Sequence, residues 1–229
     1  MLRTLIATVL LAYAAGLARA DLIAEYTFPS LSGLPPAAGY NPTASDPGIT
    51  ASPVTVGAGI TFVEISNPTP NYASQPVLRI DPAGSTTPGD AVTANRYWTF
   101  SVTPLVNPLN LSALDFGAGR GGASTARGFA LYSSVDAFTA PLLSTDVAGL
   151  RPTLTPYTVD LTGAAFQGLP VGTPVSFRFY VYSPNAGATL EFDNVSLTGT
   201  VVPEPTGFAL LLAGGLGLWR WSRREGRGR

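Results

Sequence analysis

The sequence has 229 residues, of which 45% are hydrophobic, and its 25 Gly and 21 Pro make up about a fifth of the chain. That share is below the roughly 25–30% of low-complexity chains and suits one packed domain with short loops. The sequence contains no His, no Cys and no Lys, since all 13 basic residues are Arg. These absences exclude Ser-His-Asp triads, thiol nucleophiles, catalytic or phosphate-binding lysines, Cys/His zinc sites and disulfides.

The first 20 residues have the pattern of a secretory signal peptide. Arg3 provides a positive start, an apolar run follows from Leu5 to Leu17, and Ala18 and Ala20 form the small-x-small pattern that signal peptidase accepts. The run is shorter than the roughly 20 residues of a membrane span, which disfavours a permanent anchor. We therefore expect export through the secretion translocon and cleavage by signal peptidase before Asp21.

The following segment reads as a series of short strands separated by turns. Runs rich in β-branched and aromatic residues predict strands at 22–28, 60–65, 97–102, 111–116, 129–133, 157–161, 175–182 and 189–197. Clusters of Gly, Pro, Asn and Asp predict turns at 81–84, 118–122 and 183–187, and the stretch up to about residue 50 is expected to be loop-rich. No segment of twelve or more residues has helical periodicity with caps. We predict an all-β fold for residues 21–200, an antiparallel β-sandwich of the jelly-roll type, flanked by the signal helix and a short C-terminal transmembrane helix.

The alternation is clearest in residues 175–182. Val175, Phe177, Phe179 and Val181 occupy one face, which we expect to be core, and the intervening Ser, Arg and two Tyr occupy the other, which we expect to contact water.

Residues 21–205 carry six Arg against thirteen acidic residues, a formal charge of −7. This charge disfavours a nucleic-acid partner.

The last expected strand holds the most promising carboxylates. Phe192 and Val195 cannot share a face under strict alternation, so we expect a bulge at Asp193-Asn194 that turns the Asp side chain away from the ladder. The string from Phe192 to Leu197 resembles the last strand of jelly-roll carbohydrate-binding and lectin-like domains. That resemblance implies a structural calcium ion held by Asp193 with Glu25 or Asp21; the alternative is an acid that caps a solvent-exposed bulge.

Two further patterns bear on function. Glu191 and Asp193 are similar to the strand carboxylates of laminarinase-like glycosidases, but the second catalytic Glu of that pattern would fall at Val195, so the acid–nucleophile pair is incomplete. Five aromatic residues are candidates for stacking on sugar rings, but packing within strands is the favoured interpretation, and no glycan contact is assigned. These aromatic residues are Tyr97, Trp98, Tyr132, Tyr180 and Tyr182.

The C-terminal segment, residues 202–229, combines three features in order. Pro203-Glu204-Pro205 is followed by a Leu- and Gly-rich helix at about 206–221 and by an arginine-rich tail over 220–229 that includes Arg220, Arg223 and Arg224. The fourteen residues 206–219 would reach roughly 21 Å as a helix, against a hydrocarbon core of about 30 Å, which makes an ordinary tail anchor the weaker alternative. The arginine cluster would stay in the cytoplasm and leave residues 21–205 outside.

This order of features resembles the PEP-CTERM sorting signal of Gram-negative bacteria, a segment also catalogued as an ice-binding protein C-terminal domain. The resemblance implies transient insertion into the inner membrane, processing by an exosortase and delivery to the cell surface or extracellular matrix, often with exopolysaccharide. The favoured function is thus a non-enzymatic surface or matrix protein, and two roles stay open for its β-sandwich domain: glycan binding and self-association. The alternatives are a carboxylate-dependent polysaccharide enzyme and, more weakly, an ice-binding protein, since regular Thr-x-Thr ladders are missing.

Overall fold

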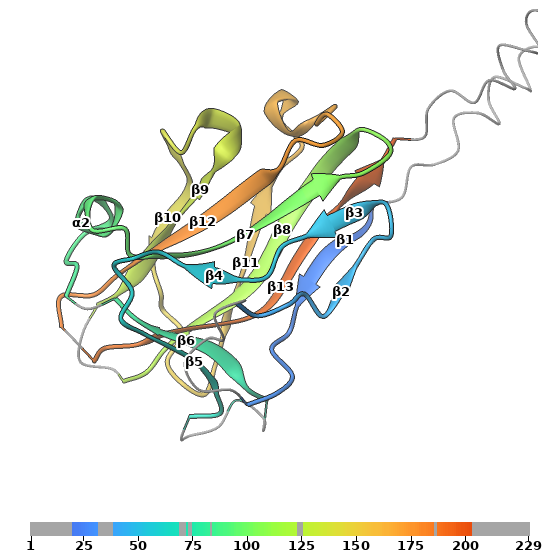
Figure 1. Ribbon diagram of the computed structural model, residues 1–229. Helices are drawn as coiled ribbons and strands as arrows, with labels where there is room; N and C mark the ends of the chain where they lie inside the picture. The colour runs from blue at the N-terminus through green and yellow to red at the C-terminus, as the bar shows by residue number, and fades with distance from the viewer. Residues whose placement is uncertain are drawn as a thin grey trace, which may run out of the picture.

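The computed structural model describes residues 20–31, 39–68, 72, 75–82, 84–122, 126–185 and 187–202 (Figure 1). The predicted signal peptide up to residue 19 and the predicted sorting segment from Pro203 onward lie outside the described residues. Within the described ranges, no helix is long and apolar enough to cross a membrane.

Two antiparallel sheets face each other and enclose the core (Figure 1). The first, here called the β8–β13 sheet, has the order β11-β8-β13-β1-β2, and the β5–β6 hairpin extends it because β6 also pairs with β13. Its strands are β1 (Asp21–Tyr26), β2 (Ala44–Ser45), β5 (Phe62–Ser66), β6 (Val77–Asp81), β8 (Leu109–Arg120), β11 (Thr155–Asp160) and β13 (Leu190–Val201).

The second sheet, here called the β7–β12 sheet, has the order β10-β9-β12-β7-β3, and β4 also pairs with β7. Its strands are β3 (Ile49–Ala51), β4 (Thr55–Val56), β7 (Tyr97–Pro104), β9 (Gly128–Ser133), β10 (Pro141–Asp146) and β12 (Val175–Tyr182). One short α-helix, α2 (Pro88–Thr93), and two 3-10 turns, η1 (Ser134–Asp136) and η2 (Ala164–Phe166), complete the described elements.

The connectivity confirms the predicted jelly roll. The eight strands of six residues or more, taken in chain order as first to eighth, are arranged 1-8-3-6 in the β8–β13 sheet and 2-7-4-5 in the β7–β12 sheet. Among these eight strands, only β9 and β10 follow each other within one sheet, and every other step crosses to the opposite sheet. Such crossing is what brings β1 beside β13, from opposite ends of the described chain.

Aromatic residues dominate the space between the sheets. Trp98 is fully buried and stacks on Phe179 with ring centroids 3.9 Å apart, and Phe192 of the opposite sheet meets Trp98 edge-on. Each such pair stabilises the fold by roughly 0.5–1.5 kcal/mol beyond the contribution of its buried apolar area. The predicted core face of β12 is confirmed, because Val175, Phe177, Phe179 and Val181 are all buried.

The opposite face of β12 is partly exposed to solvent only in the first half of the strand, at Ser176 and Arg178. Tyr180 and Tyr182 are buried there, contrary to expectation, because α2 packs on this end of the sheet and Ala91 contacts the two rings. The helix itself is fixed by a capping box in which Thr87 and Asp90 satisfy each other's backbone N–H groups.

The predicted turn at residues 118–122 is wrong, since β8 continues through Arg120. Three glycines alternate along its outer face, and residues 149–154 pack directly upon them. A Cβ at Gly119 would lie 3.0 Å from Leu154 Cδ2, and one at Gly121 would lie 2.6 Å from Arg151 Nη2. These glycines therefore allow a close approach of another segment and do not break the strand.

Candidate functional site

The predicted bulge at the centre of β13 is present. The register between β13 and β8 shifts between Asp193 and Ser196, and Asn194 adopts a left-handed backbone with φ of 53°. The extra residue explains why both Phe192 and Val195 reach the core. The expectation of an exposed, capping acid is wrong, because Asp193 is only 2% exposed and Asn194 takes the exposed position instead.

Asp193 is a buried carboxyl with little to stabilise its charge. Its Oδ1 atom has no hydrogen-bond partner among the described residues, and the compensating contact is the backbone N–H of Asn194. Burial raises the pKa of Asp193 to about 6, and the Asn194 hydrogen bond offsets this only in part.

Glu191, two residues earlier, faces the same outer side of the sheet but is stabilised as a charge. It is completely buried, accepts a hydrogen bond from the Tyr72 hydroxyl and forms an ion pair with Arg151. Thr189 Oγ1 donates to Glu191 Oε1 at 3.3 Å, and Arg79 Nε lies 4.0 Å from the same oxygen. Through its ion pair with Arg151, the Glu191 carboxylate has a structural role: it attaches residues 149–154 to the sheet.

The structure does not assemble the three residues predicted to bind calcium into a metal site. Among the described residues, no three acidic side chains lie close enough together to hold a metal ion. Asp21 and Glu25 lie on β1 opposite Gly199 and Ser196, whereas Asp193 is buried beside β8 opposite Gly117. Calcium binding by these residues stays a prediction.

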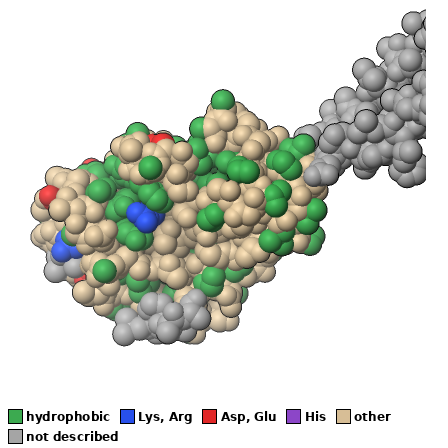
Figure 2. Space-filling view, turned by 45° about the horizontal axis from the view of Figure 1, so that its top comes forward, with side chains coloured by type: hydrophobic (Ala, Val, Ile, Leu, Met, Phe, Trp, Pro, Cys, Tyr) green, Lys and Arg blue, Asp and Glu red, His purple; other side chains and the backbone are tan. Residues whose placement is uncertain are grey.

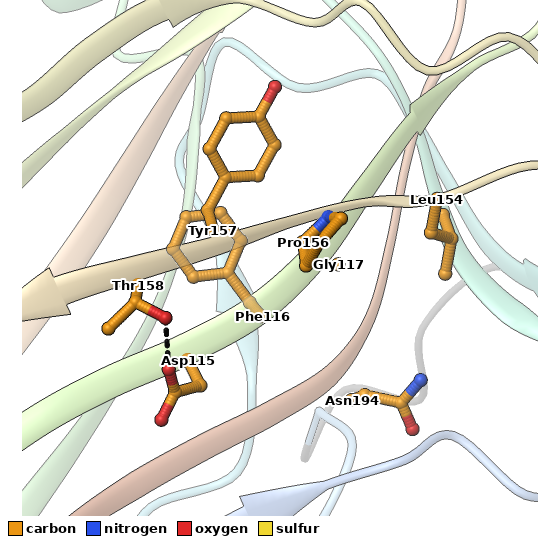
Figure 3. Close-up of a pocket in the computed structure, with 8 residues that line it drawn as sticks. All are labelled: Asp115, Phe116, Gly117, Leu154, Pro156, Tyr157, Thr158 and Asn194. Carbon is orange, nitrogen blue, oxygen red and sulfur yellow. Dashed lines mark hydrogen bonds between the residues drawn. The ribbon is translucent and has the colours of Figure 1, made fainter.

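A pocket opens on the outer face of the β8–β13 sheet, beside the bulge (Figure 3). It has a volume of about 390 Å³, within the 300–1,000 Å³ range of small-ligand pockets. Three neighbouring strands and the segment that precedes β11 contribute its lining. The lining residues are Asp115, Phe116, Gly117, Leu154, Pro156, Tyr157, Thr158 and Asn194.

The polar groups of the pocket are fixed by the backbone around them. Asp115 of β8 and Thr158 of β11 are directly paired across the ladder, and the Thr158 hydroxyl donates to Asp115 Oδ1 at 2.5 Å. Asn194 is presented by the bulge, and Figure 3 shows it on the other side of the pocket from the Asp115–Thr158 hydrogen bond. Between them lies Gly117, where no side chain covers the backbone of the sheet, and Pro156 and Leu154 supply apolar surface.

This arrangement suits a neutral ligand that carries several hydroxyl groups. The Asp115 carboxylate accepts hydrogen bonds, and the Asn194 amide both donates and accepts. Among the described residues of the lining, Asp115 is the only charged one, and its negative charge disfavours anionic ligands. Sequence reasoning missed Asp115, Thr158 and Asn194 as a group, since only the pairing of β11 with β8 and of β8 with β13 brings them together.

The aromatic residues considered as sugar platforms divide into two groups. Trp98, Tyr180 and Tyr182 are buried, which confirms packing for these three. Tyr97 and Tyr132 are half-buried on the outer face of the β7–β12 sheet, where each meets Tyr180 edge-on. None of the five lines the pocket on the opposite sheet.

No protein family and no curated protein matches the sequence. Among solved structures, the chain is similar to the K3 adhesin domain of Lys-gingipain from Porphyromonas gingivalis, with 14% identity, a TM-score of 0.43, and coverage of 79% of this chain and 99% of that one. A CBM4 structure gives 11% identity, a TM-score of 0.42 and coverage of 76% and 97%. The carbohydrate-binding module TmCBM27, described as recognising mannan, gives 13% identity, a TM-score of 0.41 and coverage of 80% and 99%. At these identities and TM-scores, the similarities carry no conclusion about ligand or activity.

Proposed function

We propose that this protein is a non-enzymatic β-sandwich that binds a neutral polysaccharide in the pocket between Asp115 and Asn194. The observation that carries the proposal is the pair of hydrogen-bonding side chains on either side of a side-chain-free strip of rigid sheet. Sugars present vicinal hydroxyl groups to such pairs and C–H faces to apolar walls like Pro156 and Leu154. A rigid scaffold keeps the ordering cost of binding low.

The buried carboxylates argue against the alternative of a polysaccharide-cleaving enzyme. Glycoside hydrolysis needs two carboxyl groups on either side of an accessible glycosidic bond. Glu191 is completely buried in its ion pair and Asp193 is 2% exposed, so this pair is not presented to a substrate. Turnover of any polysaccharide that disappears in Glu191→Gln or Asp193→Asn would overturn the non-enzymatic assignment.

The binding proposal is tested by measuring affinity for a panel of neutral polysaccharides with the purified full-length chain. Asp115→Asn keeps the side-chain shape and the Thr158 contact but removes the charge, and Asn194→Gly removes the amide while tolerating the positive φ. We expect each to weaken binding about tenfold or more, as for hydrogen bonds to charged or buried partners. Asp21→Asn, at an exposed carboxylate on β1, is the matched control and should bind like the wild type. Equal affinities for all four proteins, or no binding to any neutral polysaccharide, would refute the proposal.

We further propose that the protein acts outside the inner membrane, at the cell surface or in the extracellular matrix, after export and exosortase processing. The sequence features that support this are the signal pattern ending at Ala20 and the ordered Pro203-Glu204-Pro205, apolar helix and arginine tail. Mass spectrometry of the mature C-terminus in cells with and without the exosortase tests it. An arginine tail that remains intact in both strains would contradict processing.

A further inference from the structure

Arg178 occupies an unusual position on the outer face of the β7–β12 sheet. Its guanidinium carbon lies 3.9 Å from the centroid of the Phe138 ring and 4.7 Å from that of the Tyr97 ring. Contacts with two aromatic rings fix the orientation of the guanidinium plane, and the N–H groups at its edge can still donate hydrogen bonds. In Figure 2 a basic side chain lies among hydrophobic side chains on the face that comes forward.

The loop that supplies Phe138 is held in an uncommon conformation. Ala137 and Phe138 both have φ of 58°, a left-handed region that bulky residues rarely adopt. Hydrogen bonds fix this turn, from the Phe138 N–H to the Ser133 carbonyl at 2.9 Å and from the Ala140 N–H to the Asp136 carboxylate at 3.0 Å. Such strain persists where the surrounding structure enforces it, and it often marks a binding site.

The edge of the Arg178 guanidinium is not used by an acid. Within the part of the chain that the structure describes, Arg178 forms no ion pair, and its hydrogen bond is a long one of 3.4 Å from Nη1 to the Tyr180 hydroxyl. A planar fork of N–H donors with a fixed orientation matches a carboxylate in two-point contact. Because no acid among the described residues pairs with Arg178, the edge of its guanidinium is available to a carboxylate of a ligand.

We propose that Arg178, with Phe138 and Tyr97, forms a second binding site that takes the carboxylate of a uronic acid residue in a polysaccharide. The proposal deepens and rests on polysaccharide binding, but it places the acidic group on the opposite sheet from the neutral pocket. Half-buried Tyr132, which pairs with Arg178 across the ladder, offers a ring for a sugar, and Ser101 offers a hydroxyl group on the same face of β7.

The surroundings favour a polysaccharide over an acidic peptide or a nucleic acid. Polyanions with closely spaced charges are bound by clusters of Lys and Arg that neutralise several charges together. Here one guanidinium stands among aromatic and hydroxyl side chains, which suits a ligand with one charge per sugar unit and apolar C–H faces between charges.

The test compares polygalacturonate with its methyl ester at fixed ionic strength, because the two polymers differ in the charge of the carboxyl group. With the purified full-length chain, we expect tighter binding of the acid form. Arg178→Gln should weaken binding of the acid form about 10- to 100-fold, the effect of a hydrogen bond to a charged group, and leave the ester unaffected. Arg178→Lys, which keeps the charge without the fork, should recover only part of the preference.

Two other variants separate this proposal from the neutral pocket. Phe138→Gly suits the positive φ and removes the ring, so it should fold and lose most of the preference for the acid form. Asp115→Asn should retain the preference, because Asp115 lies on the other sheet. Equal binding of acid and ester by the wild type, a full preference in Arg178→Gln, or equally strong competition by poly-L-glutamate would overturn the proposal. Failure of the neutral pocket alone would appear as unchanged neutral binding in Asp115→Asn with the Arg178 effect intact.

Discussion

Asp193→Asn is expected to stabilise the protein at neutral pH, although it replaces a buried residue in the central strand. Asp193 is 2% exposed, Oδ1 has no hydrogen-bond partner among the described residues, and burial raises its pKa to about 6 from 3.8. Asn has nearly the same shape, keeps an oxygen for the Asn194 N–H, and carries no charge at any pH in the range.

The direction of the pH dependence follows from proton binding. Between pH 3.8 and about 6 the folded protein holds the Asp193 proton more tightly than the unfolded chain does, so stability falls as pH rises. The loss is complete above about pH 6. At 1.36 kcal/mol per pH unit, the difference between the two pKa values corresponds to about 3 kcal/mol, equivalent to roughly 6–12 °C in Tm for a domain of this size.

Urea unfolding of the wild type and Asp193→Asn from pH 4 to pH 8, in EDTA, measures this effect. The free energy of unfolding of Asp193→Asn minus that of the wild type should rise by about 2.5 kcal/mol over the range, because part of the effect is already present at pH 4. Titration of other groups cancels in this difference, and any constant packing effect of Asn appears equally at every pH. If the free energies of unfolding of the two proteins changed in parallel with pH, the ionisation of Asp193 would not destabilise the fold, and the assignment would be refuted.

Three more substitutions, one of them with a matched control, test the packing described above by urea unfolding. Gly119→Ala should destabilise the fold by about 1–3 kcal/mol, because its Cβ would lie 2.6 Å from the Tyr72 hydroxyl. The control is Gly163→Ala, which should be near neutral because its Cβ would meet nothing within 4 Å. Equal effects of the two substitutions would contradict the close approach of residues to Gly119. Glu191→Gln should cost about 2–4 kcal/mol by leaving Arg151 without its partner charge, and a neutral result would mean that the ion pair is not what holds residues 149–154. Thr87→Ala should cost about 1 kcal/mol through loss of the capping box, unless α2 depends on its contact with β12 alone.

Much of the sandwich was predictable because one face of most strands is buried. The alternation of β12 gave its bounds, and the phase change between Phe192 and Val195 located the bulge in β13. The glycines after Phe116 were misread because a turn glycine and a glycine beneath a packed segment look the same in sequence. β6, between Pro76 and Pro82, was missed because it is short, and β10 was missed because its sequence lacks a clean alternation.

The candidate sites were much less predictable, because they depend on which strands are neighbours. Asp115, Thr158 and Asn194 come from three different strands; Asn194 lies in the predicted bulge, but neither Asp115 nor Thr158 stands out in its own segment. Arg178 was correctly placed on the outer face of β12, but nothing in the sequence indicates that a left-handed turn brings Phe138 onto it. The buried state of Glu191 likewise depends on Tyr72 and Arg151, which reach it from distant loops.

The pairing of Asp21 with Gly199 has a consequence for the order in which an exported chain can fold. On the proposed export route, β1 is the first strand of the domain to leave the translocon, and β13, which lies between β8 and β1 and also pairs with β6, is the last. The middle of one sheet is therefore missing until the whole domain has been delivered, and shorter translocation intermediates should remain sensitive to protease. Closure of the sandwich would then report that translocation has reached residue 201, just before the chain enters its C-terminal segment.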